Sequence, residues 1–452
     1  MRNSLALPLC IVTLLAGCAT APPGPPTPAP RTAGALACAP ALERRLAAIA
    51  DDPELPLAGL AVVALRDGQV RFQAAFGRRW IDPAQPGTGL PLRHDTLVRV
   101  ASVSKTVTAL GAMALVEQGL LDLDADLERY VGRPVRNPRH PDQPITVRQL
   151  LSHTSTLGDA AGYFFEPEVS VLDLLQRPEA WLPQGRPGQW FGYANLNWTV
   201  LGTLMERVTG KRFDRLMAQR VLRPLGIDGG YFPPDWHADE RARLATLYRR
   251  RDGDGTWRPE GAWHPQKDDL QGGTEPPPPD LARWVPGTNA SPFSPTGGLR
   301  ISTDGLARLL AMLLRQGQGP GPSVPGAAAL AQRHALQWQA NGAAGAEASN
   351  GDTQGGLFQA WGLGVQRFTD RSAPGWGDRL AQRGGLTGWG HLGEAYGAYT
   401  GLFYDPDSGR AMAWVVTGFG NDPERERGRW SAMHGVEERI TDALARCVLD
   451  TE

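Results

Sequence analysis

Two strand-forming hairpins, one near each end of the chain, place the strongest restriction on its fold. Residues 59–65 and 70–76 are rich in β-forming residues and flank an Asp67-Gly68 turn, and residues 399–404 and 411–416 form a similar pair. An isolated hairpin is only marginally stable in water, so each must pack against further structure. The simplest arrangement places both in one antiparallel sheet covered by terminal helices, with the two ends of the globule as neighbours.

The long segment between the hairpins is predicted to be mostly helical. Residues 106–118 are apolar around most of the helical circumference, which is typical of a buried helix. Leu306 to Leu314 follow the i, i+3, i+4 pattern, with Thr303 as the predicted N-cap. Further helices are expected over about 197–208 and 431–449, and long loops over 251–295, 317–328 and 340–356. These elements predict an α/β (α+β) fold with an antiparallel sheet and a mostly helical lobe.

The first residues carry the features of an export signal. An apolar run over residues 5–15 follows a basic residue and is too short to span a membrane as a helix. The run ends in Leu-Ala-Gly-Cys18, which resembles the lipobox of bacterial lipoproteins and implies removal of residues 1–17 and a lipid on Cys18. We therefore expect an exported protein, anchored by this lipid to a cell-envelope membrane at its periplasmic face. An ordinary signal peptide cut nearby is the alternative.

Residues 18–37 are predicted to form a tether, because their Pro, Ala, Thr and Gly cannot bury a core. The globule begins near Cys38. Cys38 and Cys447 lie at its two ends, and export permits them to form a disulfide. Two buried thiols are the alternative.

The balance of charge argues against nucleic acid as a partner. Lys and Arg number 46 against 47 Asp and Glu, so the net charge of -1 provides no electrostatic footprint for nucleic acid, and we expect none to bind. Only Lys105, Lys211 and Lys267 are lysines; the other basic residues are arginines. Arginine keeps its proton in proteins whereas a desolvated lysine can lose it, so each lysine is a candidate titratable amine.

Ser102 and Lys105 form a Ser-Val-Ser-Lys motif where the buried helix is predicted to begin. Residues three apart lie on one face of a helix, so the amine can approach the hydroxyl. The positive end of the helix dipole favours negative charge on Ser102. Both effects favour a nucleophilic serine. The motif by itself occurs often by chance, and without further context a surface Ser-Lys pair is the more common explanation.

Two later segments supply further polar groups. Tyr193 and Asn195 lie two residues apart at a predicted loop-to-helix junction, where both can face one pocket. His391 lies between Gly390 and Gly393 ahead of the second hairpin, and these glycines allow the backbone to approach a ligand closely.

Together the three motifs resemble those of the serine β-lactamase and penicillin-binding protein superfamily, in its class C β-lactamase, D-peptidase and carboxylesterase branch. Ser102-Val103-Ser104-Lys105 matches S-x-x-K, Tyr193-Ala194-Asn195 matches Y-[AS]-N, and His391-Leu392-Gly393 matches [KH]-[TSx]-G. Two landmarks agree with the family pattern: Leu150-Leu151-Ser152-His153-Thr154-Ser155, and Gly297-Gly298-Leu299 before a helix. The likeness extends from about residue 56 to residue 449.

The resemblance implies a role for each residue of the first two motifs. Ser102 would be the acylated nucleophile, and Lys105 and Tyr193 would share proton transfer to and from it. Which of these two groups is deprotonated stays open. Asn195 would hydrogen-bond the substrate amide or the Lys105 amine.

The third motif would line the substrate site. The backbone N–H groups of Ser102 and Glu394 would form the oxyanion hole, and His391 and Gly393 would contact substrate. His391-Leu392 replaces the Lys-Thr typical of true β-lactamases, which removes a permanent cation and a hydroxyl that grip a β-lactam's carboxylate. A histidine that is neutral at pH 7 fits amide, peptide or ester substrates better.

The sequence therefore predicts a serine hydrolase that acts through a Ser102 acyl-enzyme on amide, D-peptide or ester bonds. Its substrates would be small molecules or peptides, including cell-wall peptides. The alternatives are a true class C-type β-lactamase and a non-hydrolytic penicillin-binding lipoprotein. The catalytic domain would span 38–449, with an α/β lobe over about 38–95 and 290–449, a helical lobe over about 96–289, and the active site between them.

No cofactor or catalytic metal is expected, because the sequence contains no H-E-x-x-H and no cysteine cluster. The G-x-G-x-x-G pattern at 388–393 enters a strand-forming run instead of opening a helix, which argues against dinucleotide binding. Residues 252–255 lack a full calcium loop and are predicted to be a turn. The absence of a G-x-S-x-G elbow argues against an α/β-hydrolase.

Overall fold

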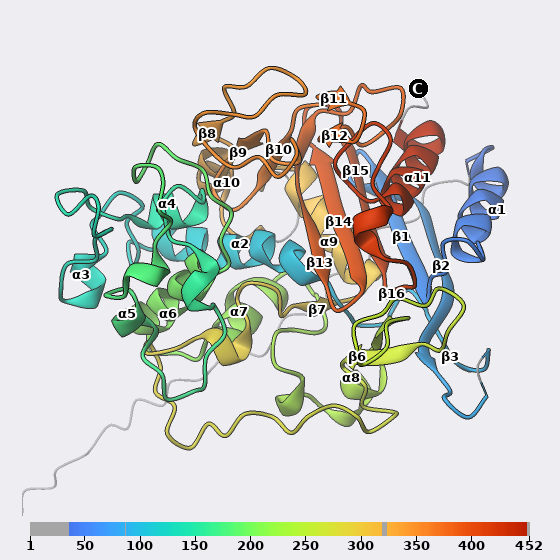
Figure 1. Cartoon of the computed structure of the whole chain (residues 1–452), viewed down its shortest axis with the longest axis horizontal. Coiled ribbons are helices and arrows are strands. Elements are labelled where there is room, and N and C mark those ends of the chain that lie inside the picture. The colour runs from blue at the N-terminus through green and yellow to red at the C-terminus, as the bar shows by residue number, and fades with distance from the viewer. Residues whose placement is uncertain (1–35, 86, 319–322, 450–452) are drawn as a thin grey trace, which may run out of the picture.

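The computed structural model describes residues 36–85, 87–318 and 323–449 (Figure 1). Cys18, the predicted signal peptide and nearly all of the predicted tether lie outside the described residues. Within the described part, a nine-stranded sheet forms the centre of the molecule, and every strand pairs antiparallel with its neighbours. Its order is β3 (Gly89–Pro91), β2 (Gln69–Ile81), β1 (Gly59–Arg66), β15 (Arg410–Val416), β14 (Ala398–Asp405), β13 (Gly388–Ala395), β10 (Gln366–Phe368), β9 (Ala360–Trp361) and β8 (Trp338–Gln339). Both predicted hairpins therefore belong to one antiparallel sheet, which confirms the expected fold class.

The other elements surround this sheet or form the helical region beside it (Figure 1). The longer helices are α1 (Ala39–Ala50), α2 (Ser104–Glu117), α6 (Leu196–Thr209), α9 (Thr303–Leu314), α10 (Ala327–Arg333) and α11 (Gly435–Leu444). The shorter helices are α3 (Glu128–Val131), α4 (Val147–Leu151), α5 (Val171–Leu174), α7 (Phe213–Met217) and α8 (Ala238–Ala242). Small sheets pair β4 (Val98–Arg99) with β7 (Arg300–Ile301), β11 (Ser372–Ala373) with β12 (Trp376–Gly377), and β5 (Leu247–Arg249) with both β6 (His264–Lys267) and β16 (Gly418–Phe419).

Strand β1 is apolar on both faces because both faces of the sheet are covered. Successive side chains of a strand point to opposite faces. Leu60 and Val62 pack in the core that contains α1 and α11, whereas Ala61 and Val63 pack in the core that contains α2 and α9. The pairing of β1 with β15 brings the two ends of the chain into the same sheet, as the hairpins predicted.

Two helix starts differ from the predicted ones, because a neighbouring side chain provides the cap. The Ser302 side chain caps α9, so the predicted N-cap, Thr303, is the first helical residue. The terminal helix begins at Gly435 instead of near residue 431, because His434 and Glu437 form a capping box. This helix continues to Leu449 as a π-helical turn.

A disulfide joins Cys38, directly before α1, to Cys447, in the turn that follows α11. The pairing expected from the sequence is therefore present, and it closes a loop with a sequence separation of 409 residues. Helices α1 and α11 pack against each other beside the bond (Figure 1), and Arg45 forms an ion pair with Asp442 across this contact.

Replacing both cysteines with alanine is expected to lower the free energy of unfolding by about 3 kcal/mol, because the disulfide restricts the unfolded chain. Guanidinium denaturation of oxidised wild type and C38A/C447A measures the difference. Reduced wild type is the control and should unfold at nearly the midpoint of the double variant. An unchanged midpoint after reduction would show that the bond contributes no stability.

Among the described residues, no helix combines the length and the apolar character needed to cross a membrane.

Candidate active site

Ser102 lies in a short 3₁₀ turn, Ala101–Val103, that leads into α2. Ser102 therefore lies two residues before the first residue of α2, whereas the sequence analysis placed it in the first turn of the helix. Ala101 has a φ of 45°, a left-handed conformation that is uncommon for a residue with a side chain. Leu299 fixes this turn from the neighbouring β7 segment, because its carbonyl accepts the Val100 N–H at 2.9 Å and its N–H donates to Ser104 Oγ at 3.0 Å.

Lys105 brings its amine to the Ser102 hydroxyl, as the three-residue spacing predicted. Its Nζ lies 2.9 Å from Ser102 Oγ, and 2.8 Å from both Asn195 Oδ1 and the Thr296 carbonyl oxygen. The side chain is completely buried. Burial, opposed in part by the Asp159 carboxylate, lowers the pKa of Lys105 to about 7.

The three contacts of Lys105 satisfy an ammonium, and they can also be satisfied by an amine that has lost one proton. A neutral amine keeps two N–H groups, which can donate to the two pure acceptors, Asn195 Oδ1 and the Thr296 carbonyl. Its lone pair then points to the remaining neighbour, Ser102 Oγ, and can accept the hydroxyl proton. The geometry therefore allows Lys105 to act as a general base toward Ser102.

Tyr193 is held beside this pair by stacked rings. Its ring stacks on His153 at 4.4 Å between centroids and on Phe358 at 5.0 Å, and its hydroxyl hydrogen-bonds the Ser102 side chain. Burial raises the pKa of Tyr193 well above its usual value of about 10, so the phenol is protonated at neutral pH. Of the two groups that the sequence left open, these opposite pKa shifts favour Lys105 as the deprotonated one.

Asp159 is a functional residue that the sequence analysis missed. Its carboxylate accepts the backbone N–H groups of Asn195, at 3.0 Å, and Leu196, at 2.9 Å, and so caps α6. It also accepts the Asn195 side-chain amide at 2.9 Å, which turns the Asn195 oxygen toward Lys105. The sequence carried no signal for this role, because Asp159 lies 36 residues before Asn195.

Gly393 brings strand β13 against the nucleophile. A Cβ at this position would lie 2.9 Å from the Ser102 backbone nitrogen and 2.8 Å from the Val100 carbonyl oxygen, so a larger residue cannot fit without movement. The backbone that follows, at Glu394, is part of the cavity wall beside Ser102. The N–H groups of Ser102 and Glu394 can bind one oxyanion only if the two segments lie this close together.

His391 does not lie where the sequence analysis placed it. Its neighbours Leu392 and Gly393 line the cavity, but the His391 ring is 1% exposed and packs edge-on against Trp361 and Tyr193. Burial and the nearby Lys105 amine lower its pKa to about 3, so the ring is neutral. A substrate-binding role for this side chain is therefore not supported; the ring supports Tyr193 instead.

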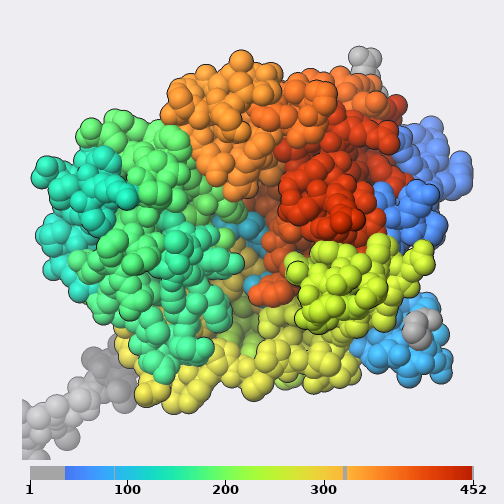
Figure 2. Space-filling view, viewed as in Figure 1, coloured from blue at the N-terminus to red at the C-terminus, as the bar shows by residue number. Residues whose placement is uncertain are grey.

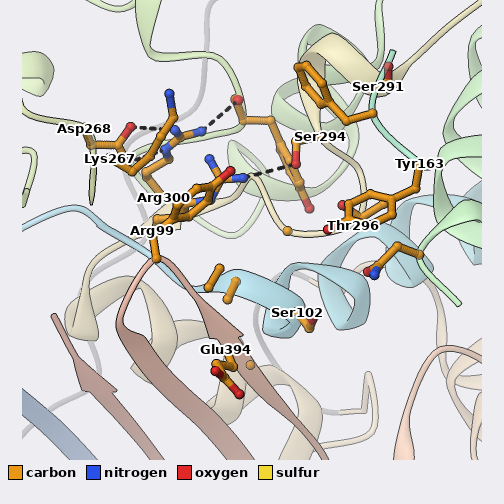
Figure 3. A pocket seen from close by; sticks show the side chains of 18 of the residues that line it. Arg99, Ser102, Tyr163, Lys267, Asp268, Ser291, Ser294, Thr296, Arg300 and Glu394 are labelled. Atoms are coloured by element: carbon orange, nitrogen blue, oxygen red, sulfur yellow. Dashed lines mark hydrogen bonds and ion pairs between the residues drawn. The ribbon is translucent and has the colours of Figure 1, made fainter. Parts of the chain in front are cut away.

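The motifs meet at a cavity of about 1520 Å³. Ser102, Tyr193, Asn195, Gly393 and Glu394 all contribute to its wall. Its opening is the hollow between the green helical region and the orange and red strands (Figure 2). The cavity can admit a substrate of peptide size, with Ser102 on its wall (Figure 3).

With an ester that does not itself ionise, kcat/KM is expected to rise with pH through about 7 and then level off, because the protonated Lys105 cannot accept the Ser102 proton. Asp159→Asn should move the midpoint to lower pH, since it removes a carboxylate that favours the ammonium form. A pH–rate profile for both proteins is the measurement. A wild-type profile that rises only near the usual lysine pKa of about 10.4 would contradict this assignment.

Several known proteins have sequences or structures similar to this chain. Esterase EstB of Burkholderia gladioli is 33% identical over 248 residues, which cover 49% of this chain and 60% of EstB. Monacolin J acid methylbutanoyltransferase of Aspergillus terreus is 32% identical over 222 residues, which cover 44% of this chain and 53% of that enzyme. This chain thus spans little more than half the length of these relatives.

The fold has a counterpart in the D-amino acid amidase of Ochrobactrum anthropi, with a TM-score of 0.62, 19% identity, and coverage of 91% of this chain and 100% of the amidase. The family model described as Beta-lactamase matches residues 42–436, a range that contains all three motifs. The chain therefore belongs to the Beta-lactamase family.

Proposed function

We propose that this protein is a serine hydrolase that cleaves amide or ester bonds through an acyl-enzyme on Ser102. The observation that carries the proposal is the completely buried Lys105 amine, 2.9 Å from Ser102 Oγ and with a pKa lowered to about 7. An amine with this pKa is about half deprotonated near neutral pH, which is the condition for a general base at that pH.

In the proposed reaction, Lys105 takes the Ser102 proton while Oγ bonds to the substrate carbonyl carbon. The resulting oxyanion is held by backbone N–H groups of Ser102 and Glu394. The bond to the leaving group breaks as that group receives a proton from Tyr193, and the Lys105 ammonium then returns a proton to the Tyr193 oxygen. A water molecule then attacks the carbonyl carbon of the acyl-enzyme. The bond from that carbon to Ser102 Oγ breaks, Oγ regains a proton, and the acid is released.

The favoured substrates are esters, amides and peptides with D-residues. The names of the similar proteins, an esterase and a D-amino acid amidase, support this range. The neutral, buried His391 supports slow turnover of β-lactams, because the third motif then offers no side-chain cation to their carboxylate. Hydrolysis of nitrocefin faster than that of esters would favour the alternative, a true β-lactamase.

Export and lipid anchoring through Cys18 are a separate part of the proposal. The apolar run over residues 5–15 and the lipobox-like Leu-Ala-Gly-Cys18 support them. Incorporation of labelled palmitate into the full chain, lost in Cys18→Ser, is the expected result. Incorporation that persists in that variant would exclude the anchor.

The decisive test of the hydrolase is covalent labelling. A fluorescent fluorophosphonate should label wild type, and mass mapping of the digest should locate the label on Ser102. Ser102→Ala should take up no label. A label that persists on the alanine variant, or that maps to another serine, would end the assignment. Stoichiometric labelling without turnover of any ester or D-peptide would favour a non-hydrolytic binding protein.

A further inference from the structure

Arg99 is a buried cation on the wall of the active-site cavity, three residues before the nucleophile. It belongs to β4, where its partner in the antiparallel pair with β7 is Arg300. Like charges directly opposite each other in a sheet are destabilising. Arg99 is only 8% exposed and Arg300 only 5%, so water screens this repulsion poorly. A pair of this kind needs compensation from nearby carboxylates.

The carboxylates near this pair are engaged by other cations. Arg300 forms a two-pronged ion pair with Asp268, at 2.9 and 2.6 Å (Figure 3). Lys267 forms an ion pair with Glu275. Three cations therefore face two carboxylates within this cluster, and both carboxylates are occupied. Arg99 forms no ion pair in the described part of the chain, and Asp268 and Glu275 attract it only from beyond contact distance.

The guanidinium of Arg99 also has unused hydrogen-bonding capacity. The structure gives it one hydrogen bond, from Nη2 to Ser294 Oγ at 3.3 Å, and its buried Nε has no partner in the described part of the chain. A guanidinium has five N–H groups in a planar fork that matches a carboxylate. A buried guanidinium without an ionic partner lowers the stability of the folded protein. The presence of the Arg99 guanidinium on the cavity wall therefore points to a ligand that pairs with it.

Tyr396 and Ser294 hold the Arg99 side chain at the cavity. Arg99 lies over the Tyr396 ring, 5.1 Å from the centroid, and Tyr396 occupies the turn between β13 and β14 with a φ of 58°. Arg99, Ser294, Tyr396 and Ser102 all line the same cavity, and Figure 3 shows Arg99 and Ser102 on its wall. The cation is thus held on the surface that also presents the nucleophile.

We propose that Arg99 is a specificity-determining residue that binds a carboxylate of the substrate, so that the preferred substrates of Ser102 carry a free carboxylate near the scissile bond. The inference rests on the proposed hydrolase function, because it names a substrate class for the same cavity. A carboxylate would supply the missing charge and accept the free N–H groups.

Two pairs of esters test this inference, one for each side of the scissile bond. For the acyl side, 4-nitrophenyl hydrogen glutarate is compared with its methyl ester. For the leaving-group side, 3-acetoxybenzoate is compared with methyl 3-acetoxybenzoate. Wild type should hydrolyse the carboxylate member of at least one pair with a kcat/KM about tenfold or more above that of the neutral member, since charge-assisted contacts to a buried cation are strong.

Arg99→Gln should abolish this preference and leave the kcat/KM of the neutral ester within about threefold of wild type, and Arg99→Lys should keep part of the preference. The matched control is Arg241→Gln, because Arg241 also lines the cavity but is exposed and outside the cluster; it should behave as wild type. Absence of a carboxylate preference in wild type on both pairs would overturn the inference. Equal losses on charged and neutral esters in a folded Arg99→Gln would do the same.

Calorimetry separates this inference from the hydrolase proposal. In a Ser102→Ala background the esters are not turned over, so their dissociation constants can be measured directly. Tighter binding of the carboxylate member, lost with Arg99→Gln, supports the inference even if the wild type hydrolyses neither ester. Equal binding of both members in both backgrounds overturns it. Should Arg99→Gln not fold, Arg99→Lys replaces it: a smaller carboxylate preference than that of wild type supports the inference, and an unchanged preference overturns it.

Discussion

Ser102→Ala is expected to reduce kcat for ester hydrolysis by roughly 10⁴-fold or more, because removal of a serine nucleophile abolishes the acyl-enzyme route. The Ser102 Oγ atom is hydrogen-bonded to both the Lys105 amine and the Tyr193 hydroxyl. Its loss therefore removes the bond-forming atom and leaves the cavity intact. The melting temperature should stay close to that of wild type, because Ser102 lies on the cavity wall.

Ser104→Ala is the matched control within the same motif. Ser104 is buried, and its Oγ accepts the Leu299 N–H at 3.0 Å. This variant leaves a buried N–H without its acceptor and should lower stability by about 1–3 kcal/mol, while kcat falls by about tenfold at most. Steady-state kinetics and thermal melts of both variants check the pair. A Ser102→Ala enzyme with more than a hundredth of wild-type kcat would contradict the proposed mechanism.

Lys105→Arg is expected to reduce kcat by roughly 10³-fold, although the substitution keeps a cation, because an arginine does not release its proton in proteins. Simple charge stabilisation would be largely preserved by arginine, so this variant distinguishes a base from a fixed positive charge. A single-turnover experiment should show that acylation is the step that slows. The change should also remove the rise of kcat/KM near pH 7.

Lys211→Arg is the control for the loss of a lysine. Lys211 is exposed and bonds the Gln219 side chain, so its kinetics should match those of wild type. Lys105→Ala offers a second readout, because small primary amines added to the buffer should restore part of its activity in their neutral form. A Lys105→Arg enzyme that keeps a tenth or more of wild-type kcat would exclude Lys105 as the base.

Local patterns in the sequence were sufficient for two hairpins of the sheet and for the reactive pair. The apolar run of β1 and the turn after it require a buried hairpin, and the structure contains that hairpin with a longer second strand, Gln69–Ile81. The spacing of Ser102 and Lys105 limits how far apart they can lie on any helical path, and the 3₁₀ turn keeps them within 2.9 Å. Short-range geometry therefore decided these features.

The ends of helices and the burial of individual polar side chains were less predictable. Both Ser302 and Thr303 are good N-caps, and only the backbone geometry distinguishes them. His391 was expected to contact substrate, but ring contacts with Tyr193 and Trp361 bury it. Those contacts join segments that are far apart in the sequence, so no local pattern contains them.

The sequence by itself determined the two hairpins and the Ser-Lys pair, because β-forming runs, turn residues and a three-residue spacing act over short distances. The pairing of β1 with β15 and the Cys38–Cys447 bond join residues far apart in the chain, and the sequence offered them only as the simplest arrangement. Only the tertiary structure decided which charges are neutralised. Arg99 and Arg300 are the same residue type on paired strands, yet Asp268 binds one of them and leaves the other at the cavity. Charge pairing depends on distance and burial in three dimensions, and a sequence gives neither for residues that are far apart along the chain.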